Sequence, residues 1–266
     1  MAVPTSATRR SVARWRYVVP NAITCFSLSL GLVSMGHAMA GDHLVAAWLI
    51  VLSVLLDKLD GTAARLLGAT SRIGVQLDSL SDFVTFGIAP AFIVYAKLHG
   101  DPVGPGDVWS GEVGQLALMG LLIAYTLMAC IRLAKFNVLN DVLPAGGPKV
   151  FYGLPSTFAG GLVVVVFIIG LEYGADDVLR WLPAAALGLG LLMVSNLPLP
   201  KLAKRDSVAL NVFQGVNIVI GYTCGVFRFW PEYILGAVLL YALVGLSWGL
   251  LHRRELMPPR LDPYPQ

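Results

Sequence analysis

Charged residues are scarce in this sequence. Only 13% of its 266 residues are Asp, Glu, Lys or Arg, whereas 56% are hydrophobic and the mean hydropathy is +0.72. A water-soluble domain carries about 25% charged residues, so most of this chain has no face suited to water. The shortage excludes an ordinary soluble enzyme and predicts an integral membrane protein, whose solvent is the lipid bilayer.

Cysteine is rare as well, and no two cysteines are paired by their spacing. Cys25, Cys130 and Cys224 lie in separate apolar runs, and the sequence contains no C-x-x-C pair. These facts argue against a cysteine-based zinc site and against a disulfide framework. We expect all three to be buried small apolar residues, which is the usual place of a free cysteine.

What the sequence has in abundance is apolar segments of about 20 residues, enough to cross the hydrocarbon core of a bilayer. The predicted spans lie near residues 18–40, 43–66, 74–97, 114–138, 153–173, 181–197, 209–228 and 233–251. The arginine-rich segment before the first span is typical of a short interfacial helix. The predicted fold class is therefore all-α, with about eight transmembrane helices and an interfacial N-terminal helix.

The charges of the loops predict how the spans are oriented, because loops rich in Lys and Arg stay in the cytoplasm. One side receives most of the basic residues: Arg9, Arg10, Arg14, Arg16, Arg65, Arg72, Arg132, Lys135, Lys149, Lys201, Lys204, Arg205, Arg253, Arg254 and Arg260. The other side receives only Lys97, Arg180 and Arg228. This alternation predicts an even number of spans in the cell membrane with both termini cytoplasmic. Without a long linker or an internal repeat, we expect one membrane domain over residues 1–256 and a disordered tail over 257–266.

Four aspartates lie at membrane depth, where carboxylates are expensive and therefore candidates for function. Asp57 and Asp60 end the second span at spacing i, i+3, and Asp78 and Asp82 begin the third at i, i+4. Each pair shares one helix face, and a turn between the spans would bring the two faces together at the cytoplasmic end. Four carboxylates at close range need cations between them, and their hard oxygens suit Mg²⁺ or Mn²⁺, with Ca²⁺ a less selective occupant.

The residues between these pairs suit a phosphate. Gly61 and Ala64 leave room beside the acidic face, and the planar fork of Arg65 can hold phosphate oxygens. Carboxylates, cations, an arginine and a groove together indicate a metal-dependent membrane site that handles a diphosphate. A cation transporter using the same carboxylates is the alternative that these residues alone leave open.

The stretch from Asp57 to Asp82 resembles the signature of the CDP-alcohol phosphotransferase family, D-x2-D-G-x2-A-R-x8-G-x3-D-x3-D. This sequence fills every specified position of that signature: Asp57, Asp60, Gly61, Ala64, Arg65, Gly74, Asp78 and Asp82. Further segments resemble the phosphatidylserine synthase branch of the family: the P-N-x-x-T opening at residues 20–24, the extended third helix at 78–90, R-L-A-K-F-N at 132–137 and F-x-G-L-P at 151–155. Lys135 stands where the branch has a second arginine.

The resemblance implies that the chain converts CDP-diacylglycerol and L-serine into phosphatidylserine and CMP. It implies that Asp57, Asp60, Asp78 and Asp82 bind two divalent ions, and that Asp82 is the general base. The residues expected to bind the CDP-lipid are Gly61, Ala64, Arg65, Ser71, Asn21 and Thr24. The resemblance also implies a homodimer.

The acceptor needs a cationic partner for its carboxylate. Arg132 and Lys135 are candidates because we expect them on the same cytoplasmic side as the aspartates, although basic residues there also contact lipid headgroups. A related transferase that uses glycerol 3-phosphate or inositol phosphate is the alternative, since the same basic residues, with Lys149, would suit a phosphorylated acceptor. Nucleic acid is not expected as a partner, because the positive charges follow the membrane topology.

Overall fold

The computed structural model describes residues 6–100, 107–142, 150–200, 207–252 and residue 256, with the backbone alone for 6–15 and 141–142. The tail at 257–266, which the sequence predicts to be disordered, lies outside the described residues. So do several basic residues used for the orientation: Lys149, Lys201, Lys204, Arg205, Arg253, Arg254 and Arg260.

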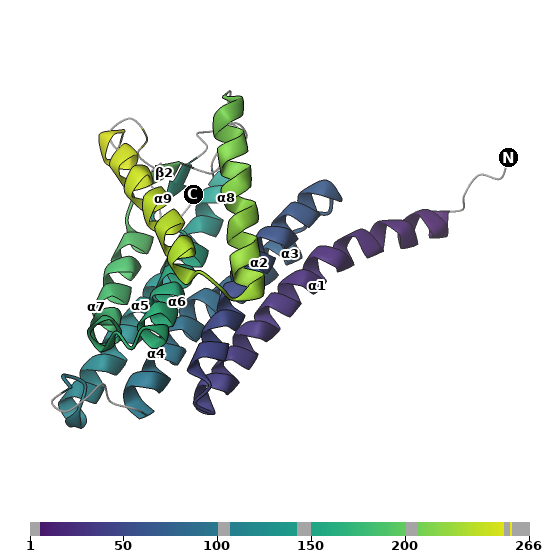
Figure 1. The fold of residues 1–266 in the computed structure, drawn as a ribbon. Coiled ribbons are helices and arrows are strands. Elements are labelled where there is room, and N and C mark those ends of the chain that lie inside the picture. The colour runs from purple at the N-terminus through teal and green to yellow at the C-terminus, as the bar shows by residue number, and fades with distance from the viewer. Residues whose placement is uncertain (1–5, 101–106, 143–149, 201–206, 253–255, 257–266) are drawn as a thin grey trace, which may run out of the picture.

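Helices make up nearly all of the described chain (Figure 1). They are α1 (Ser6–Met39), α2 (His43–Leu66), α3 (Arg72–Asp82), a π-helical segment η1 (Phe83–Ile88), α4 (Ala89–Gly100), α5 (Gly111–Val142), α6 (Ser156–Glu172), α7 (Asp176–Val194), α8 (Val208–Phe227) and α9 (Pro231–Leu251). The elements α3, η1 and α4 follow one another without a break and form one rod. Two short strands, β1 (Val150–Tyr152) and β2 (Pro198–Pro200), complete the described elements.

The lengths and compositions of these helices make the protein a multi-pass membrane protein. Six helical stretches are long and apolar enough to cross a membrane: Arg16–Met39, Arg72–Gly100, Gly111–Asn140, Asp176–Val194, Val208–Phe227 and Pro231–Leu251. Helix α6 is apolar but has only 17 residues, and α2 has 24 residues but carries the charges of the acidic motif. The helical bundle agrees with the predicted all-α class.

The sequence predicts a separate interfacial helix at the N-terminus. In the structure this segment is instead the first part of α1. This helix runs unbroken for 34 residues with Pro20 inside it, which corresponds to about 51 Å at 1.5 Å per residue. Figure 1 shows its N-terminal half projecting away from the bundle. No glycine or turn sequence separates Arg16 from Pro20, and the hydroxyl oxygen of Thr24 lies 3.1 Å from the Pro20 carbonyl oxygen.

Two further features differ from the prediction. The sixth span begins at Asp176 rather than near residue 181, because Asp176 and Asp177 suit the positive end of the helix dipole and extend its first turn. The strands β1 and β2, which the sequence does not predict, pair antiparallel with Val150 opposite Pro200. They join the segment before α6 to the segment after α7, and the Tyr241 hydroxyl of α9 donates to the Pro200 carbonyl (2.8 Å).

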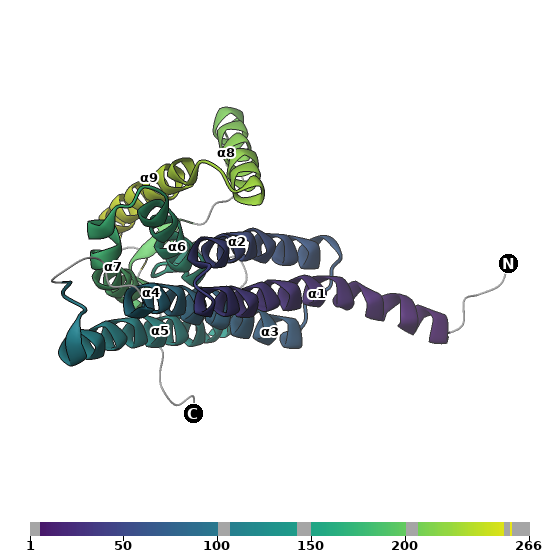
Figure 2. The same cartoon turned by 60° about the horizontal axis from the view of Figure 1, so that its bottom comes forward.

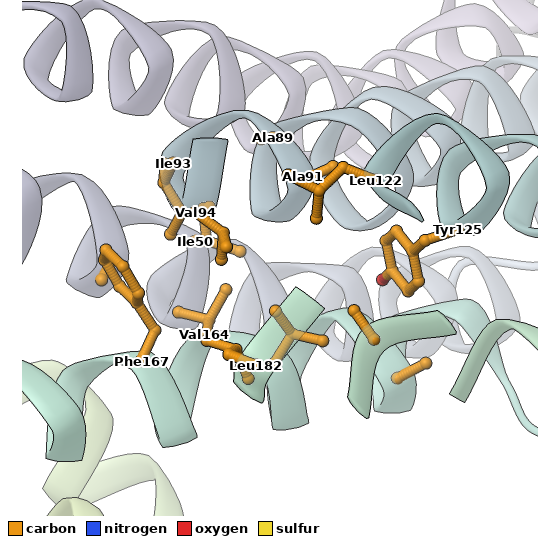
Figure 3. Close-up of a cluster of buried hydrophobic side chains, with 14 of the residues drawn as sticks. Ile50, Ala89, Ala91, Ile93, Val94, Leu122, Tyr125, Val164, Phe167 and Leu182 are labelled. Carbon is orange, nitrogen blue, oxygen red and sulfur yellow. The ribbon is translucent and has the colours of Figure 1, made fainter. Parts of the chain in front are cut away.

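The buried core lies where α2, α4, α5, α6 and α7 meet (Figure 3). Its fully buried side chains include Ile50, Val94, Tyr125, Val164 and Phe167. The expectation that all three cysteines are buried is wrong: Cys224 is buried, but Cys25 and Cys130 are exposed. In a membrane protein the exposed surface of a span faces lipid, so a small apolar side chain has no reason to avoid it.

Candidate active site

Three of the four predicted aspartates meet at the ends of α2 and α3. Ligand oxygens of Asp57, Asp60 and Asp78 lie within 4.8 Å of one another, and Asp60 is only 5% exposed. The turn at residues 67–71 reverses the chain after α2, as the sequence predicts, and Figure 2 shows α1 lying between α2 and α3. The carboxylates of the two helices therefore come together at this end of the bundle, although α1 packs against both α2 and α3.

Hydroxyl groups from other helices hold the carboxylates in place. Thr24 of α1 donates to Oδ2 of Asp60 at 2.7 Å. At the start of α6, the Thr157 hydroxyl donates to Oδ2 of Asp57 at 3.4 Å. Buried carboxylates require such partners, because an unpaired polar group away from water is costly.

Asp82 is the last residue of α3 and is also buried, with 9% of its surface exposed. Asp82 is not among the carboxylates whose oxygens lie within 4.8 Å of one another, but its side chain neighbours that of Asp57. The Ser156 hydroxyl donates to Oδ2 of Asp82 at 3.4 Å, and Nη1 of Arg132 donates to the same Ser156 oxygen at 3.0 Å. A buried arginine, a serine and an aspartate thus form one chain of hydrogen bonds between α5, α6 and α3.

Arg132 is well enclosed for a charged side chain. It is 6% exposed, and its guanidinium carbon lies 5.0 Å from the centre of the Phe136 ring. The aromatic ring and the nearby carboxylates favour the cation. Its burial beside Asp82 is a stronger indication of function than the sequence offers, since basic residues on the cytoplasmic side commonly contact headgroups.

Lys135, the other predicted acceptor residue, points elsewhere. Its ammonium donates to the carbonyls of Val194 (3.1 Å) and Ser195 (3.0 Å) and to the side chain of Asn196. These partners are the last turn of α7 and the residues after it, where orphan carbonyls and the negative end of the helix dipole attract a cation. The structure therefore gives Lys135 a role in joining α5 to α7.

The residues predicted to bind the CDP-lipid lie around the same end of α2. Asn21 is close to the turn, because a Cβ placed on Gly74 would lie 3.2 Å from its Oδ1 and 3.1 Å from Oγ of Ser71. Ser71 begins α3 and accepts a hydrogen bond from the Gly74 amide at 2.9 Å. Gly61 and Ala64 are half-buried, whereas Arg65 is exposed and its guanidinium donates to the Thr62 hydroxyl at 3.2 Å.

Sequence reasoning missed Ser156 and Thr157 as members of the site. They stand 74 and 100 residues from Asp82 and Asp57, so no local spacing connects them. The one available signal was the F-x-G-L-P segment, which ends at Pro155 immediately before them. Lys58 was also not predicted; it forms an exposed ion pair with Asp57 at 3.1 Å.

The acidic cluster fits a divalent cation. Two oxygens on opposite sides of a Mg²⁺ ion lie about 4 Å apart, which matches the separation of the Asp57, Asp60 and Asp78 oxygens within 4.8 Å. The donor set consists of carboxylates alone, which suits hard cations rather than zinc or copper. These three residues could hold a metal ion, with the Asp82 carboxyl beside them.

Comparisons with known proteins agree with this chemistry. A family model described as CDP-alcohol phosphatidyltransferase matches residues 17–193. Three similar proteins, each named CDP-diacylglycerol–serine O-phosphatidyltransferase, come from different bacteria. The one from Helicobacter pylori is 32% identical over 227 residues, covering 77% of this chain and 90% of its own. The one from Mycobacterium bovis is 30% identical over 244 residues (90% and 80%), and the one from Bacillus subtilis is 33% identical over 196 residues (73% and 96%).

Proposed function

Because the chain belongs to the CDP-alcohol phosphatidyltransferase family, we propose that it transfers a phosphatidyl group from CDP-diacylglycerol to L-serine, giving phosphatidylserine and CMP. The observation that carries the proposal is the acidic cluster, together with the buried arginine that is linked to Asp82 through Ser156. The names of its relatives, which share about 30% identity over most of the chain, support serine as the acceptor.

The four aspartates would hold two divalent ions, Mg²⁺ or Mn²⁺, with Ca²⁺ a further candidate occupant. Asp57, Asp60 and Asp78 form the closest group of oxygens, and Asp82 completes the set. When bound, these ions would stabilise negative charge on the transferring phosphoryl group and on the departing CMP. Thr24 and Thr157 would keep the Asp60 and Asp57 carboxylates oriented, because each occupies one oxygen with a hydrogen bond.

Asp82 would act as the general base. The serine hydroxyl oxygen forms a bond to the phosphorus of the phosphatidyl group, the bond from that phosphorus to the CMP oxygen breaks, and the hydroxyl proton passes to Asp82. Because the Ser156 hydroxyl is bonded to Oδ2 of Asp82, we assign the proton to Oδ1. Ser156 would then fix the direction in which the free oxygen of Asp82 points.

The CDP moiety would lie against the exposed side of α2 and the turn that follows it. Gly61 and Ala64 have small side chains there, so a ligand can approach the helix backbone. Arg65 is exposed and able to reach a phosphate. Asn21, Thr24 and Ser71 border the same region from α1 and the start of α3. The aspartates and the CDP-binding residues would thus share one end of the bundle.

The acceptor serine would place its carboxylate on Arg132. The hydrogen bond to Ser156 uses one of the five N–H donors of a guanidinium, and a carboxylate can bind two of the others in a bidentate pair. Lys135 is the weaker candidate of the two, since its ammonium is bonded at the end of α7.

We place the protein in the cell membrane with both termini and the active site on the cytoplasmic side. The support is the distribution of Lys and Arg between the loops. We count α2 and α6 as spans as well, which gives eight crossings and keeps the termini on one side. A homodimer is part of the proposal through the family resemblance.

The decisive experiment measures CMP release by the purified protein in detergent with CDP-diacylglycerol and Mn²⁺ or Mg²⁺. L-serine, glycerol 3-phosphate and inositol 1-phosphate are offered separately, and Asp82→Asn is the control variant. We expect CMP release that depends on serine and on the metal and falls at least about a thousandfold in the variant, as for loss of a group essential to the chemistry. CMP release with a phosphorylated acceptor alone would replace serine in the proposal, and none with any acceptor would reopen the cation transporter.

A further inference from the structure

The rod that carries Asp78 and Asp82 changes its helical type immediately after Asp82. Residues Phe83–Ile88 form a π-helical turn, and the Ala89 amide donates to the carbonyl of Val84, five residues earlier. In an α-helix the carbonyl of Phe86 would accept from residue 90, but that residue is Pro90, which has no N–H and whose ring collides with that carbonyl. A wider turn relieves the collision, and the proline deprives the Phe86 carbonyl of its α-helical donor.

Tyr125 of α5 supplies that donor. Its hydroxyl donates to the Phe86 carbonyl at 2.7 Å, and the side chain is fully buried. The hydroxyl of the next residue, Thr126, is shared between the Leu122 carbonyl of its own helix (3.0 Å) and the Gly87 carbonyl (3.2 Å). Figure 3 shows the Tyr125 ring at one end of the buried cluster. Two adjacent residues of α5 thus bond two adjacent carbonyls of the π-helical turn.

The neighbouring helices are shaped to receive this wider turn. A Cβ on Gly160 of α6 would lie 2.7 Å from the Phe86 carbonyl oxygen, and a Cβ on Gly31 of α1 would lie 3.1 Å from the Thr85 hydroxyl. Glycine at both places lets the helix backbones approach closely. The π-helical turn is therefore enclosed on several sides, and its geometry is shared with α1, α5 and α6.

The turn also sets the relative orientation of the two ends of the rod. One residue more or less per turn rotates everything beyond it by about 100° relative to the residues before it. Before the turn, Asp78 belongs to the acidic cluster and Asp82 accepts a hydrogen bond from Ser156; after it, Ala89, Ile93 and Val94 are fully buried in the core. If the turn closed into an α-helix, the core contacts of α4 and the direction of Asp82 could not both be kept.

We propose that Tyr125 is a positioning residue for Asp82: its hydrogen bond to the Phe86 carbonyl holds the π-helical turn that aims the Asp82 carboxyl at the metal and acceptor sites. The part of this inference that concerns kcat rests on the proposed function. Tyr125 lies outside the aspartate motif and its hydroxyl bonds a backbone carbonyl, so its effect is transmitted through the backbone of η1.

The test compares Tyr125→Phe with Tyr241→Phe. Both substitutions remove one hydroxyl that donates to a backbone carbonyl, but the Tyr241 bond ends at Pro200 in β2 and not at the site. We expect Tyr125→Phe to lower kcat for CMP release about tenfold and to weaken Mn²⁺ binding, followed by electron paramagnetic resonance, while KM for CDP-diacylglycerol stays within about twofold. The Tyr241→Phe protein should keep both properties.

Three results would overturn the proposal. In the first, the Tyr125→Phe and Tyr241→Phe proteins have the same kcat and the same Mn²⁺ affinity. In the second, both variants lose the same share of the wild-type kcat. In the third, a fall in the Tm of Tyr125→Phe accounts for all of its lost activity. If the wild-type protein releases no CMP with serine, the proposed function fails, and the Mn²⁺ titration still decides the role of Tyr125.

Pro90 provides a second, independent check. Pro90→Ala returns an N–H to the position opposite the Phe86 carbonyl, so the need for the tyrosine hydroxyl should diminish. We expect the two changes to be non-additive: adding Tyr125→Phe to the Pro90→Ala protein should change Mn²⁺ affinity and kcat by less than half as much, on a logarithmic scale, as adding it to the wild type. Additive effects would contradict the assignment.

Discussion

At the residue scale, the hydrogen bonds from Arg132 through Ser156 to Asp82 would connect the proposed acceptor site to the proposed base. The guanidinium is almost completely enclosed, and it lies in the same buried region as the carboxylate proposed as the base. A charge in such a place is costly unless it is paired. The N–H groups of Arg132 that do not bond Ser156 would therefore donate to a substrate that brings its own carboxylate.

Replacing Arg132 by lysine tests this directly. Lysine keeps the positive charge but loses the planar fork that binds a carboxylate through two parallel hydrogen bonds. We expect KM for serine to rise about tenfold to a hundredfold, the equivalent of a charge-assisted hydrogen bond of about 1.5–3 kcal/mol, while KM for CDP-diacylglycerol changes less than about threefold. Steady-state kinetics with each substrate varied in turn measures both values.

Ser156→Ala is the matched control for that experiment. It removes the hydroxyl between Arg132 and Asp82 without touching either charge. If Arg132 binds the substrate L-serine directly, Ser156→Ala should lower kcat more than it raises KM for L-serine. Equal rises in both Michaelis constants for Arg132→Lys would contradict the assignment and leave Arg132 with a structural role.

At the element scale, the turn between β1 and α6 positions the two hydroxyls that reach the aspartates. Gly153 has a positive φ of 82°, and a Cβ there would lie 2.3 Å from the Met193 carbonyl oxygen of α7. Its amide donates to the Leu197 carbonyl at 2.9 Å. A glycine is thus required both by the backbone conformation and by the close approach of α7.

Gly153→Ala should therefore displace the start of α6 and reduce both stability and activity. We expect a loss of stability of about 2–4 kcal/mol, from about 1–3 kcal/mol of backbone strain plus the steric clash. The control is Gly174→Ala, where φ is also positive (58°) but a Cβ would meet nothing within 4 Å. Thermal unfolding in detergent, followed with the CMP assay, should show the larger loss for Gly153→Ala; equal losses would mean that strain alone decides both.

At the scale of the whole molecule, the bundle separates two groups of turns. Figure 1 shows the α1–α2 and α6–α7 turns at the lower end, away from β2. The aspartates belong to the opposite end, beside the α2–α3 turn. The proposed orientation places that end in the cytoplasm, where CDP-linked lipids and serine would have to be available.

Single cysteines on a variant without Cys25, Cys130 and Cys224 test this orientation. Thr70 lies exposed in the α2–α3 turn, and Asp176 lies exposed at the start of α7. A membrane-impermeant maleimide added to intact cells should modify Asp176→Cys and spare Thr70→Cys until the membrane is opened. Labelling of Thr70→Cys alone in intact cells would reverse the orientation.

Much of this arrangement was predictable from the sequence, and the reasons are local. Membrane spans follow from hydropathy, and the turn after α2 follows from the break between two apolar runs. The aspartates were identified because spacings of three and four residues place side chains on one helix face whatever the helix packs against. The main local errors were the separate interfacial helix and the burial of Cys25 and Cys130, since composition describes neither helix continuity nor the side that faces lipid.

The sequence by itself therefore determined the class of protein, the approximate spans and the acidic motif, because each depends on residues close together in the chain. Only the tertiary structure decided that Ser156 and Thr157 bond Asp82 and Asp57, and that Lys135 is bonded at the end of α7. It also decided that Tyr125 completes the π-helical turn after Asp82. These contacts join residues 39 to 100 positions apart, and their existence depends on how the helices pack rather than on any local pattern.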